Sequence, residues 1–357
     1  MLSFKIRHLT VLSLALTLIA AGCNSNKTPS NAESAAPASS GSTEPTAAGT
    51  EVKAGKLDIK VSFYPMYEFT KNIAGDLADV ETLIPAGVEP HDWEPTAQDM
   101  AEISAADMLV YNGAGMEGWA QQVIGSASGT PLIAVEASKG LNIMEGVEEE
   151  EEDHTGAEDD HAPEEGEHTD EEGGHTDEGH DHGGLDPHVW LAPSLAIKEV
   201  QTITAALSAA SPENASTFKS NSDAYVAKLE QLDRDFKEGL KDTKRKDFIT
   251  QHAAFGYLAK EYGLTQVPIA GLSPEQEPSA AQMAGIVEFA KAHDVKTIFF
   301  ETLVSSSVAD TVAREIGAKT AVLNPIEGLT DEDRSSNLDY LSIMRKNLEA
   351  LKTALNE

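Results

Sequence analysis

The 357-residue sequence predicts an α/β fold of two similar lobes, each a mostly parallel sheet flanked by helices, joined by one long helix. Strand-like and helix-like segments alternate twice, first across 57–210 and again across 243–357. Between these stretches, residues 211–242 carry a single amphipathic pattern that is longer than one small lobe needs. We therefore expect this helix to connect the two lobes.

The first lobe shows short apolar runs separated by helical patterns. Residues 57–63 alternate between apolar and polar side chains, which is typical of a strand. The alternation of elements that follows is typical of a parallel sheet whose crossovers are helices. Further strands are expected at 80–84, 108–111 and 131–135, with helices near 96–105 and 117–124.

The connecting helix and the second lobe continue this organisation. Apolar side chains step at three or four residues from Phe218 to Leu240, and Ser211 followed by Pro212 is a typical helix start. A helix of about 29 residues would be roughly 43 Å long. The second lobe is expected to have strands at 248–250, 266–269, 297–300 and 319–323, with helices near 253–262, 279–292, 308–316 and 335–355.

The N-terminus has the features of an exported lipoprotein. A basic stretch precedes a short apolar segment, so residues 1–22 are interpreted as a signal peptide. The cleavage region reads Ala20-Ala21-Gly22-Cys23. It resembles a bacterial lipobox, in which the signal is cut before a cysteine that is then lipidated, although Ala20 stands where Leu is usual. The alternative is a chance cysteine after an ordinary signal peptide. Residues 23–56 are expected to be a flexible tether, and the single Cys23 excludes an intrachain disulfide.

Residues 145–184 form an acidic, histidine-rich run with 19 Asp or Glu, six His and no Lys or Arg. The run carries −19 of the formal net charge of −34, so the rest of the chain is moderately acidic and has no basic footprint for nucleic acid. Imidazole and carboxylate both bind divalent transition metals. We interpret the run as an accessory loop of weak metal sites, the alternative being a solvated charge run. Its histidines are His154, His161, His168, His175, His180 and His182.

Three further histidines lie where a binding cleft is expected. His91 is in a loop, His188 follows the acidic run, and His252 comes directly after the expected strand 248–250. In open α/β sheets, ligands bind at the carboxyl ends of the strands. Three neutral imidazoles from distant segments suit zinc. Taken singly, each could equally be a solvated or hydrogen-bonded loop residue.

Five separated motifs make the chain recognisable over roughly residues 57–355. They are Val88-Glu89-Pro90-His91-Asp92-Trp93, Asp186-Pro187-His188-Val189-Trp190-Leu191, Thr250-Gln251-His252-Ala253-Ala254-Phe255-Gly256-Tyr257, Gly271-Leu272-Ser273-Pro274-Glu275-Gln276-Glu277-Pro278-Ser279 and Leu323-Asn324-Pro325-Ile326-Glu327-Gly328-Leu329. In this order, with the acidic insertion after the first, they resemble the metal-specific solute-binding lipoproteins of ABC transporters, in the zinc branch. The resemblance implies two α/β lobes joined by a rigid helix, with the metal held in the cleft between them.

The resemblance also assigns the metal ligands. It implies that His91 and His188 bind the metal from the first lobe and that His252 binds it from the second. Manganese-selective relatives have a carboxylate where this chain has His252, so the histidine indicates Zn²⁺. Because ligand histidines must be neutral, the affinity is expected to fall below about pH 6.5.

The fourth ligand is less clearly defined by the resemblance. Some relatives use an Asp where this chain has Asn324, whereas other zinc-binding relatives use a Glu that matches Glu327. Glu327 is therefore expected, with water or Glu301 as alternatives. Glu301 is otherwise expected to orient a ligand, as is Asp186 beside His188, although Asp186 could equally start a turn.

Three functions are compared. The first is a monomeric lipoprotein, anchored to the cell membrane through Cys23, that captures Zn²⁺ and delivers it to an ABC-transporter permease. The second is a surface adhesin or metal buffer of the same fold. The third is a zinc metallohydrolase with Glu301 or Glu327 as general base, but a His-Glu-x-x-His motif is absent from the sequence. A shell closed by three His and one Glu favours transport over hydrolysis.

Overall fold

The computed structural model describes residues 55–146 and 184–357. The expected signal peptide, Cys23 and nearly all of the expected tether lie outside these residues, and so do the six histidines of the acidic run. Among the helices of the described ranges, none is long and apolar enough to cross a membrane.

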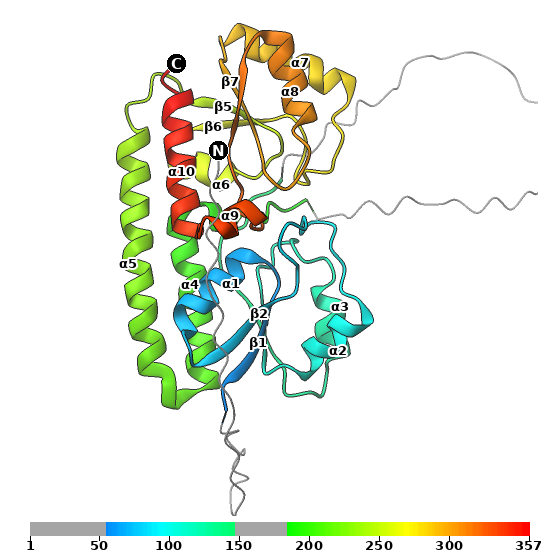
Figure 1. The fold of residues 1–357 in the computed structure, drawn as a ribbon, viewed down its shortest axis with the longest axis vertical. Coiled ribbons are helices and arrows are strands. Elements are labelled where there is room, and N and C mark those ends of the chain that lie inside the picture. Colours follow the sequence, from blue (N-terminus) through cyan, green and yellow to red (C-terminus); the bar gives the residue numbers. More distant parts are fainter. Residues whose placement is uncertain (1–54, 147–183) are drawn as a thin grey trace, which may run out of the picture. The chain divides into compact units, whose positions relative to one another are not determined.

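The first lobe contains a parallel four-stranded sheet with the order β2-β1-β3-β4, of which β1 and β2 are labelled in Figure 1. Side chains of β3 alternate between its two faces: Met108 and Val110 pack with α1 and α4, whereas Leu109 and Tyr111 pack with α2 and α3. Because helices cover both faces, the strand is apolar throughout. The elements of this lobe are β1 (Leu57–Val61), α1 (Tyr64–Ala74), β2 (Ala78–Thr82), α2 (Ala97–Ala105), β3 (Met108–Tyr111), α3 (Ala120–Ser126), β4 (Ile133–Glu136) and α4 (Pro193–Ala210).

The second lobe repeats this topology, with a parallel sheet of order β6-β5-β7-β8. In its centre Ile249 of β5 lies opposite Ile298 of β7, and both side chains are fully buried. The predicted fold class, two parallel sheets flanked by helices and joined by a long helix, is therefore confirmed. The elements are β5 (Asp247–Thr250), α6 (Gly256–Glu261), β6 (Thr265–Pro268), α7 (Ala280–Ala292), β7 (Thr297–Phe300), α8 (Ser307–Ile316), β8 (Lys319–Val322), α9 (Asp331–Ser335) and α10 (Tyr340–Ala354).

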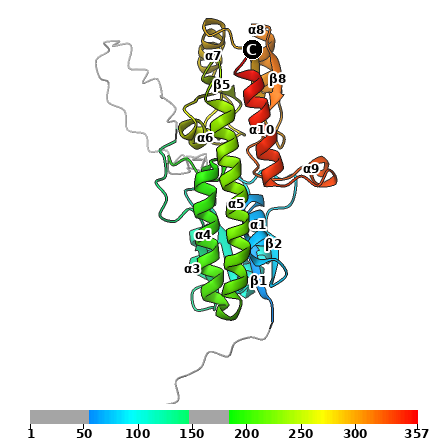
Figure 2. The ribbon, with the colours of Figure 1, turned by 90° about the vertical axis from the view of Figure 1, so that its left-hand side faces the viewer.

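The connecting helix α5 (Ala215–Leu240) follows a short 3-10 turn at Pro212–Asn214. It lies beside α4 over one half of its length and beside α10 over the other (Figure 2). Its buried side chains step at three or four residues along one face, as the amphipathic pattern predicts. A helix from the first lobe and one from the second therefore pack against the same scaffold.

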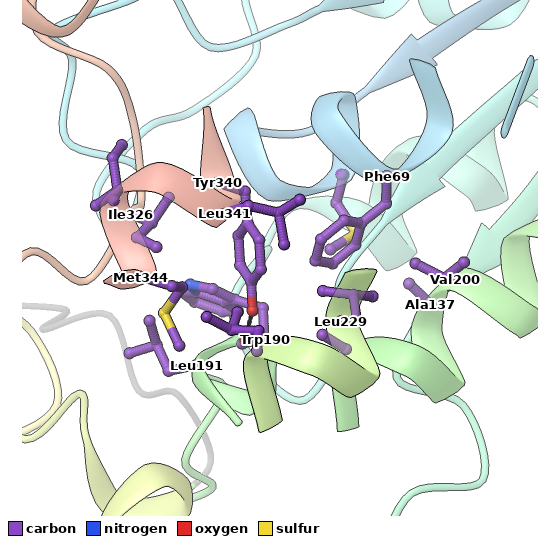
Figure 3. Close-up of a cluster of buried hydrophobic side chains, with 14 of the residues drawn as sticks. Phe69, Ala137, Trp190, Leu191, Val200, Leu229, Ile326, Tyr340, Leu341 and Met344 are labelled. Atoms are coloured by element: carbon purple, nitrogen blue, oxygen red, sulfur yellow. Dashed lines mark hydrogen bonds between the residues drawn. The ribbon is translucent and has the colours of Figure 1, made fainter. Parts of the chain in front are cut away.

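A large buried apolar cluster contains side chains of both lobes (Figure 3). The hydroxyl of Tyr340, on α10, donates a hydrogen bond to the carbonyl oxygen of Trp190 at 2.5 Å. The ring of Tyr340 also packs edge-on against Phe69 of α1, with ring centroids 5.1 Å apart. Apolar contact is thus continuous from α1 through Trp190 to α10.

Some helix boundaries differ from the sequence-based expectation. The helices α1 and α4 were not predicted, and the helix expected at 253–262 is shortened to α6. The helix expected at 335–355 is interrupted: Asn337 adopts a left-handed conformation with φ of 51°, and Asp339 then caps α10 by accepting from the backbone N–H of Ser342. The interruption lets the chain turn between α9 and α10.

Candidate metal centre

Four buried side chains from distant segments converge at one point: His91, His188, His252 and Glu327. One nitrogen or oxygen atom of each lies within 4.8 Å of all the others. Oε1 of Glu327 is 3.3 Å from Nε2 of His91, 3.2 Å from Nε2 of His188 and 3.4 Å from Nε2 of His252. None of the four side chains is more than 1% exposed.

The ends of the second sheet's strands place part of this cluster. His252 follows β5 by two residues, Glu301 directly follows β7, and Glu327 lies in the segment after β8. Parallel strands point the same way, so their carboxyl ends meet at one edge of the sheet. From the first lobe, His91 is in the turn after β2, and His188 directly precedes the 3-10 turn at Val189–Leu191.

Two carboxylates outside the cluster fix the orientation of two of the rings. Nδ1 of His188 lies 2.8 Å from Oδ1 of Asp186, and Nδ1 of His252 lies 2.5 Å from Oε1 of Glu301. A carboxylate accepts, so each Nδ1 carries the proton and each Nε2 points to the centre of the cluster. Asp186 also accepts from the backbone N–H of His188 at 3.0 Å, so its carboxylate shapes the local turn as well.

The segment that carries Glu327 is held by a contact with the first lobe and by a hydrogen bond within the segment. The indole N–H of Trp190 donates to the carbonyl oxygen of Pro325 at 2.8 Å. The backbone N–H of Ile326 donates to Oδ1 of Asn324 at 2.7 Å. Ile326 is fully buried and has φ of 62°, a left-handed conformation that is strained for a β-branched residue. These contacts keep a strained backbone in place directly before Glu327.

The charges of the cluster are set by burial and by mutual contact. Burial lowers the pKa of His91 to about 4, so this ring is neutral. Burial also opposes the charged form of His252, but the carboxylates of Glu301 and Glu327 together outweigh it and raise the pKa of His252 to about 10. Burial alone would raise the pKa of Glu327, yet the charge and hydrogen bonds of the surrounding imidazoles hold it well below its usual range. Glu327 is therefore an anion facing a cationic His252.

The donor set and its spacing fit a tetrahedral ion. Four ligand atoms about 2.0 Å from a zinc ion would lie roughly 3.3 Å from one another in a regular tetrahedron. Oε1 of Glu327 meets this spacing with all three imidazoles, and the Nε2 atoms of His188 and His252 are 3.4 Å apart. Three nitrogens with one oxygen suit zinc better than the harder ions, which take oxygen ligands.

The structure brings together the four residues expected as ligands and places Asp186 and Glu301 against two of them. Asn324 instead bonds the backbone of its own segment. Sequence reasoning missed the contact of Trp190 with Pro325 and that of Tyr257 with Asp186. Each of these residues lies within one of the five motifs, but only the folded chain shows what it touches.

Comparisons with known proteins agree with this site. The model of the family described as ZnuA, zinc-uptake complex component A, periplasmic, matches residues 59–354. The chain is 51% identical over 310 residues to the high-affinity zinc uptake system protein ZnuA of Bacillus subtilis (strain 168), covering 87% of this chain and 91% of that protein. It is 45% identical over 303 residues to the zinc-binding lipoprotein AdcA of Streptococcus pneumoniae (strain ATCC BAA-255 / R6), covering 85% of this chain. The match spans only 56% of that AdcA.

A solved structure has the same fold. The Zn(II)-bound ZnuA-like domain of Streptococcus pneumoniae AdcA superposes with a TM-score of 0.69 and 42% identity, covering 85% of this chain and 100% of that domain. The family recognised in the sequence is thereby confirmed. By its family match, by its relatives and by its fold, the chain belongs to the ZnuA family of periplasmic zinc-uptake components.

Proposed function

We propose that this protein captures Zn²⁺ outside the cytoplasm and delivers it to the permease of an ABC transporter for uptake. The observation that carries the proposal is the buried cluster of three imidazoles, each with Nε2 3.2–3.4 Å from one carboxylate oxygen of Glu327. The names of the relatives, a zinc uptake system protein and a zinc-binding lipoprotein, support the same ion and the same process. Zinc is the cargo of this protein, so tight but reversible binding is required.

In this proposal the ligands are His91, His188, His252 and Glu327. Glu301 holds the ring of His252, a role that its 2.5 Å contact with Nδ1 supports over a direct role as ligand. With four protein ligands the shell is closed, and no position remains for a water that could attack a substrate. This argument, together with membership of a solute-binding family, favours transport over a metallohydrolase.

The ligand assignment is tested by zinc titration in competition with a chelator. Alanine substitution of each histidine ligand is expected to weaken zinc binding at least tenfold, about 1.4 kcal/mol. His293→Ala is the matched control, because its side chain is 48% exposed and stacks on Phe289 away from the cluster. If no ligand substitution weakens binding more than His293→Ala does, the assignment is wrong.

Deleting residues 145–184 distinguishes the proposed function from the adhesin or metal-buffer alternative. If the buried cluster is the working site, the deleted protein still binds one equivalent of zinc tightly. Loss of all tight binding would instead make the acidic run the main functional part. A hydrolase would show turnover of ester or peptide substrates with zinc bound, and we expect none above the background rate.

We further propose that the mature protein begins at Cys23, which carries the lipid anchor. Residues 23–56 then tether the lobes 57–210 and 243–357 to the cell membrane, and the protein is a monomer. The name of AdcA as a lipoprotein supports this arrangement. Mass spectrometry of the membrane fraction should find lipid on Cys23, and Cys23→Ala should release the protein from the membrane. A Cys23→Ala protein that remains membrane-bound would refute the anchor.

A further inference from the structure

The hydroxyl of Tyr257 links three segments of the chain. Tyr257 lies on α6 of the second lobe, and its ring is 4% exposed. Its hydroxyl donates to the carbonyl oxygen of Asp186 at 2.8 Å and accepts from the backbone N–H of Met144, also at 2.8 Å. Both bonds reach residues of the first lobe, so a side chain from one lobe fixes the backbone of the other.

These two partners, Met144 and Asp186, face each other at one end of a short antiparallel ladder. The backbone N–H of Asp186 donates to the carbonyl oxygen of Met144 at 2.9 Å, and Glu145 pairs with Leu185 in an antiparallel bridge. The ladder brings together the residues at the start and at the end of the acidic run. Tyr257 therefore ties together both flanks of that run.

The ladder is in turn linked to the metal cluster through Asp186. The same residue whose carbonyl accepts from Tyr257 holds Nδ1 of His188 with its carboxylate at 2.8 Å. Its other carboxylate oxygen lies so close to Gly256 that a Cβ there would approach it to 2.8 Å. Asp186 is only 4% exposed and is thus enclosed by α6 on one side and by His188 on the other.

We infer that Tyr257 is a positioning residue of the zinc site: from the second lobe it fixes Asp186, and through Asp186 it fixes the ring of His188. This inference rests on the proposed function of the cluster. It also predicts that one connected series of hydrogen bonds holds both flanks of the acidic run and the ring of His188. A shift of the ladder is therefore transmitted to one zinc ligand, His188.

The first test compares Tyr257→Phe with Tyr262→Phe. Tyr262 is also buried, and its hydroxyl donates to Asp233 at 3.2 Å, far from the cluster. Tyr257→Phe is expected to speed zinc release into excess chelator at least fivefold and to alter the visible absorption bands of the Co²⁺-substituted protein, because the His188 ring moves. Tyr262→Phe should leave both readouts as in the wild type, even though it lowers the melting temperature.

The second test reaches the same link from the opposite side. Gly256→Ala adds a methyl group against the carboxylate of Asp186, whereas Gly285→Ala on α7 meets open space. Alanine is the better helix former, so a purely local effect would be neutral or stabilising. We expect Gly256→Ala to speed zinc release and change the Co²⁺ spectrum, and Gly285→Ala to do neither. This pair keeps the test decisive if Tyr257→Phe does not fold.

The outcomes separate this inference from the proposed function. A wild-type protein that binds no zinc overturns both. A wild-type protein that binds zinc, with Tyr257→Phe and Gly256→Ala releasing it at the wild-type rate, overturns the role of Tyr257 alone. Equal acceleration by Tyr262→Phe also overturns it, because the effect would then be one of general stability.

Discussion

Zinc binding should expel at least one proton from the cluster, and Glu301 is the residue that makes this proton available. The carboxylate of Glu301, 2.5 Å from Nδ1, acts with that of Glu327 to raise the pKa of His252 to about 10, so the ring is cationic at neutral pH. Zinc needs a free electron pair on Nε2. The proton on Nε2 must therefore leave, while the proton on Nδ1 stays on the bond to Glu301.

The magnitude follows from linkage. A histidine with a pKa raised to about 10 competes with zinc for a proton throughout the range below that value. The apparent zinc affinity should then rise about tenfold for each pH unit between roughly pH 6.5 and 10, for each proton released. If His252 had the pKa of an unperturbed imidazole, the apparent zinc affinity would stop rising near pH 6.5. Glu301→Gln removes the larger of the two carboxylate contributions that raise the pKa of His252, so fewer protons are released on zinc binding.

The assay is calorimetric titration with zinc at pH 7 in two buffers of different ionisation enthalpy, supported by chelator competition between about pH 7 and 8.5. Glu315→Gln is the control, because Glu315 lies in the same lobe but pairs with Lys291 at the surface, where its side chain is 64% exposed. The reasoning is refuted if the wild type releases less than half a proton per zinc. It is also refuted if Glu301→Gln releases as many protons as the wild type does.

Three further predictions concern stability. Glu199 is fully buried, and both its carboxylate oxygens lack a hydrogen-bond partner in the described chain. Burial, and to a smaller extent the charge of Glu117, raises the pKa of Glu199 well above the ordinary value of 4.5. The folded protein therefore keeps a proton that the unfolded chain loses, so the free energy of unfolding falls as pH rises above about 4.5. Urea denaturation at pH 5 and pH 8 should show a smaller difference in this free energy for Glu199→Gln than for the wild type. Trp190→Phe removes the bond to Pro325 and leaves a cavity, so urea denaturation should show a loss of about 2–4 kcal/mol; an unchanged midpoint would contradict this. Asp339→Ala removes the cap of α10 and should lower the melting temperature through a loss of about 1 kcal/mol.

Much of the fold could be predicted because short buried strands correspond to short apolar runs in the sequence. The strands β3 and β7 match the expected 108–111 and 297–300 to the residue. The helix α4 was missed although Val200, Ile203 and Leu207 step at helical spacing. Its other positions are largely Ala, Thr and Ser, so the contrast between an apolar and a polar face is weak. The interruption before α10 was missed because it depends on the backbone conformation of Asn337.

The candidate site could be predicted only as a set of residues in recognisable motifs. Its supporting contacts join residues that are far apart in the chain, such as Trp190 with Pro325, 135 positions away, and Asp186 with Tyr257, 71 positions away. No local pattern contains such pairs, because they arise only when the two lobes meet. The charge of His252 is likewise invisible in the sequence, since it depends on the distance to Glu301.

The continuous apolar cluster between the lobes limits how the ion can leave. Swinging the lobes apart like jaws would break the bond of Tyr340 to Trp190 and wet the apolar rings around it, at about 25 cal/mol for each Å² exposed. The frame of α4, α5 and α10 therefore opposes such an opening, so the ion would have to leave while this cluster stays packed.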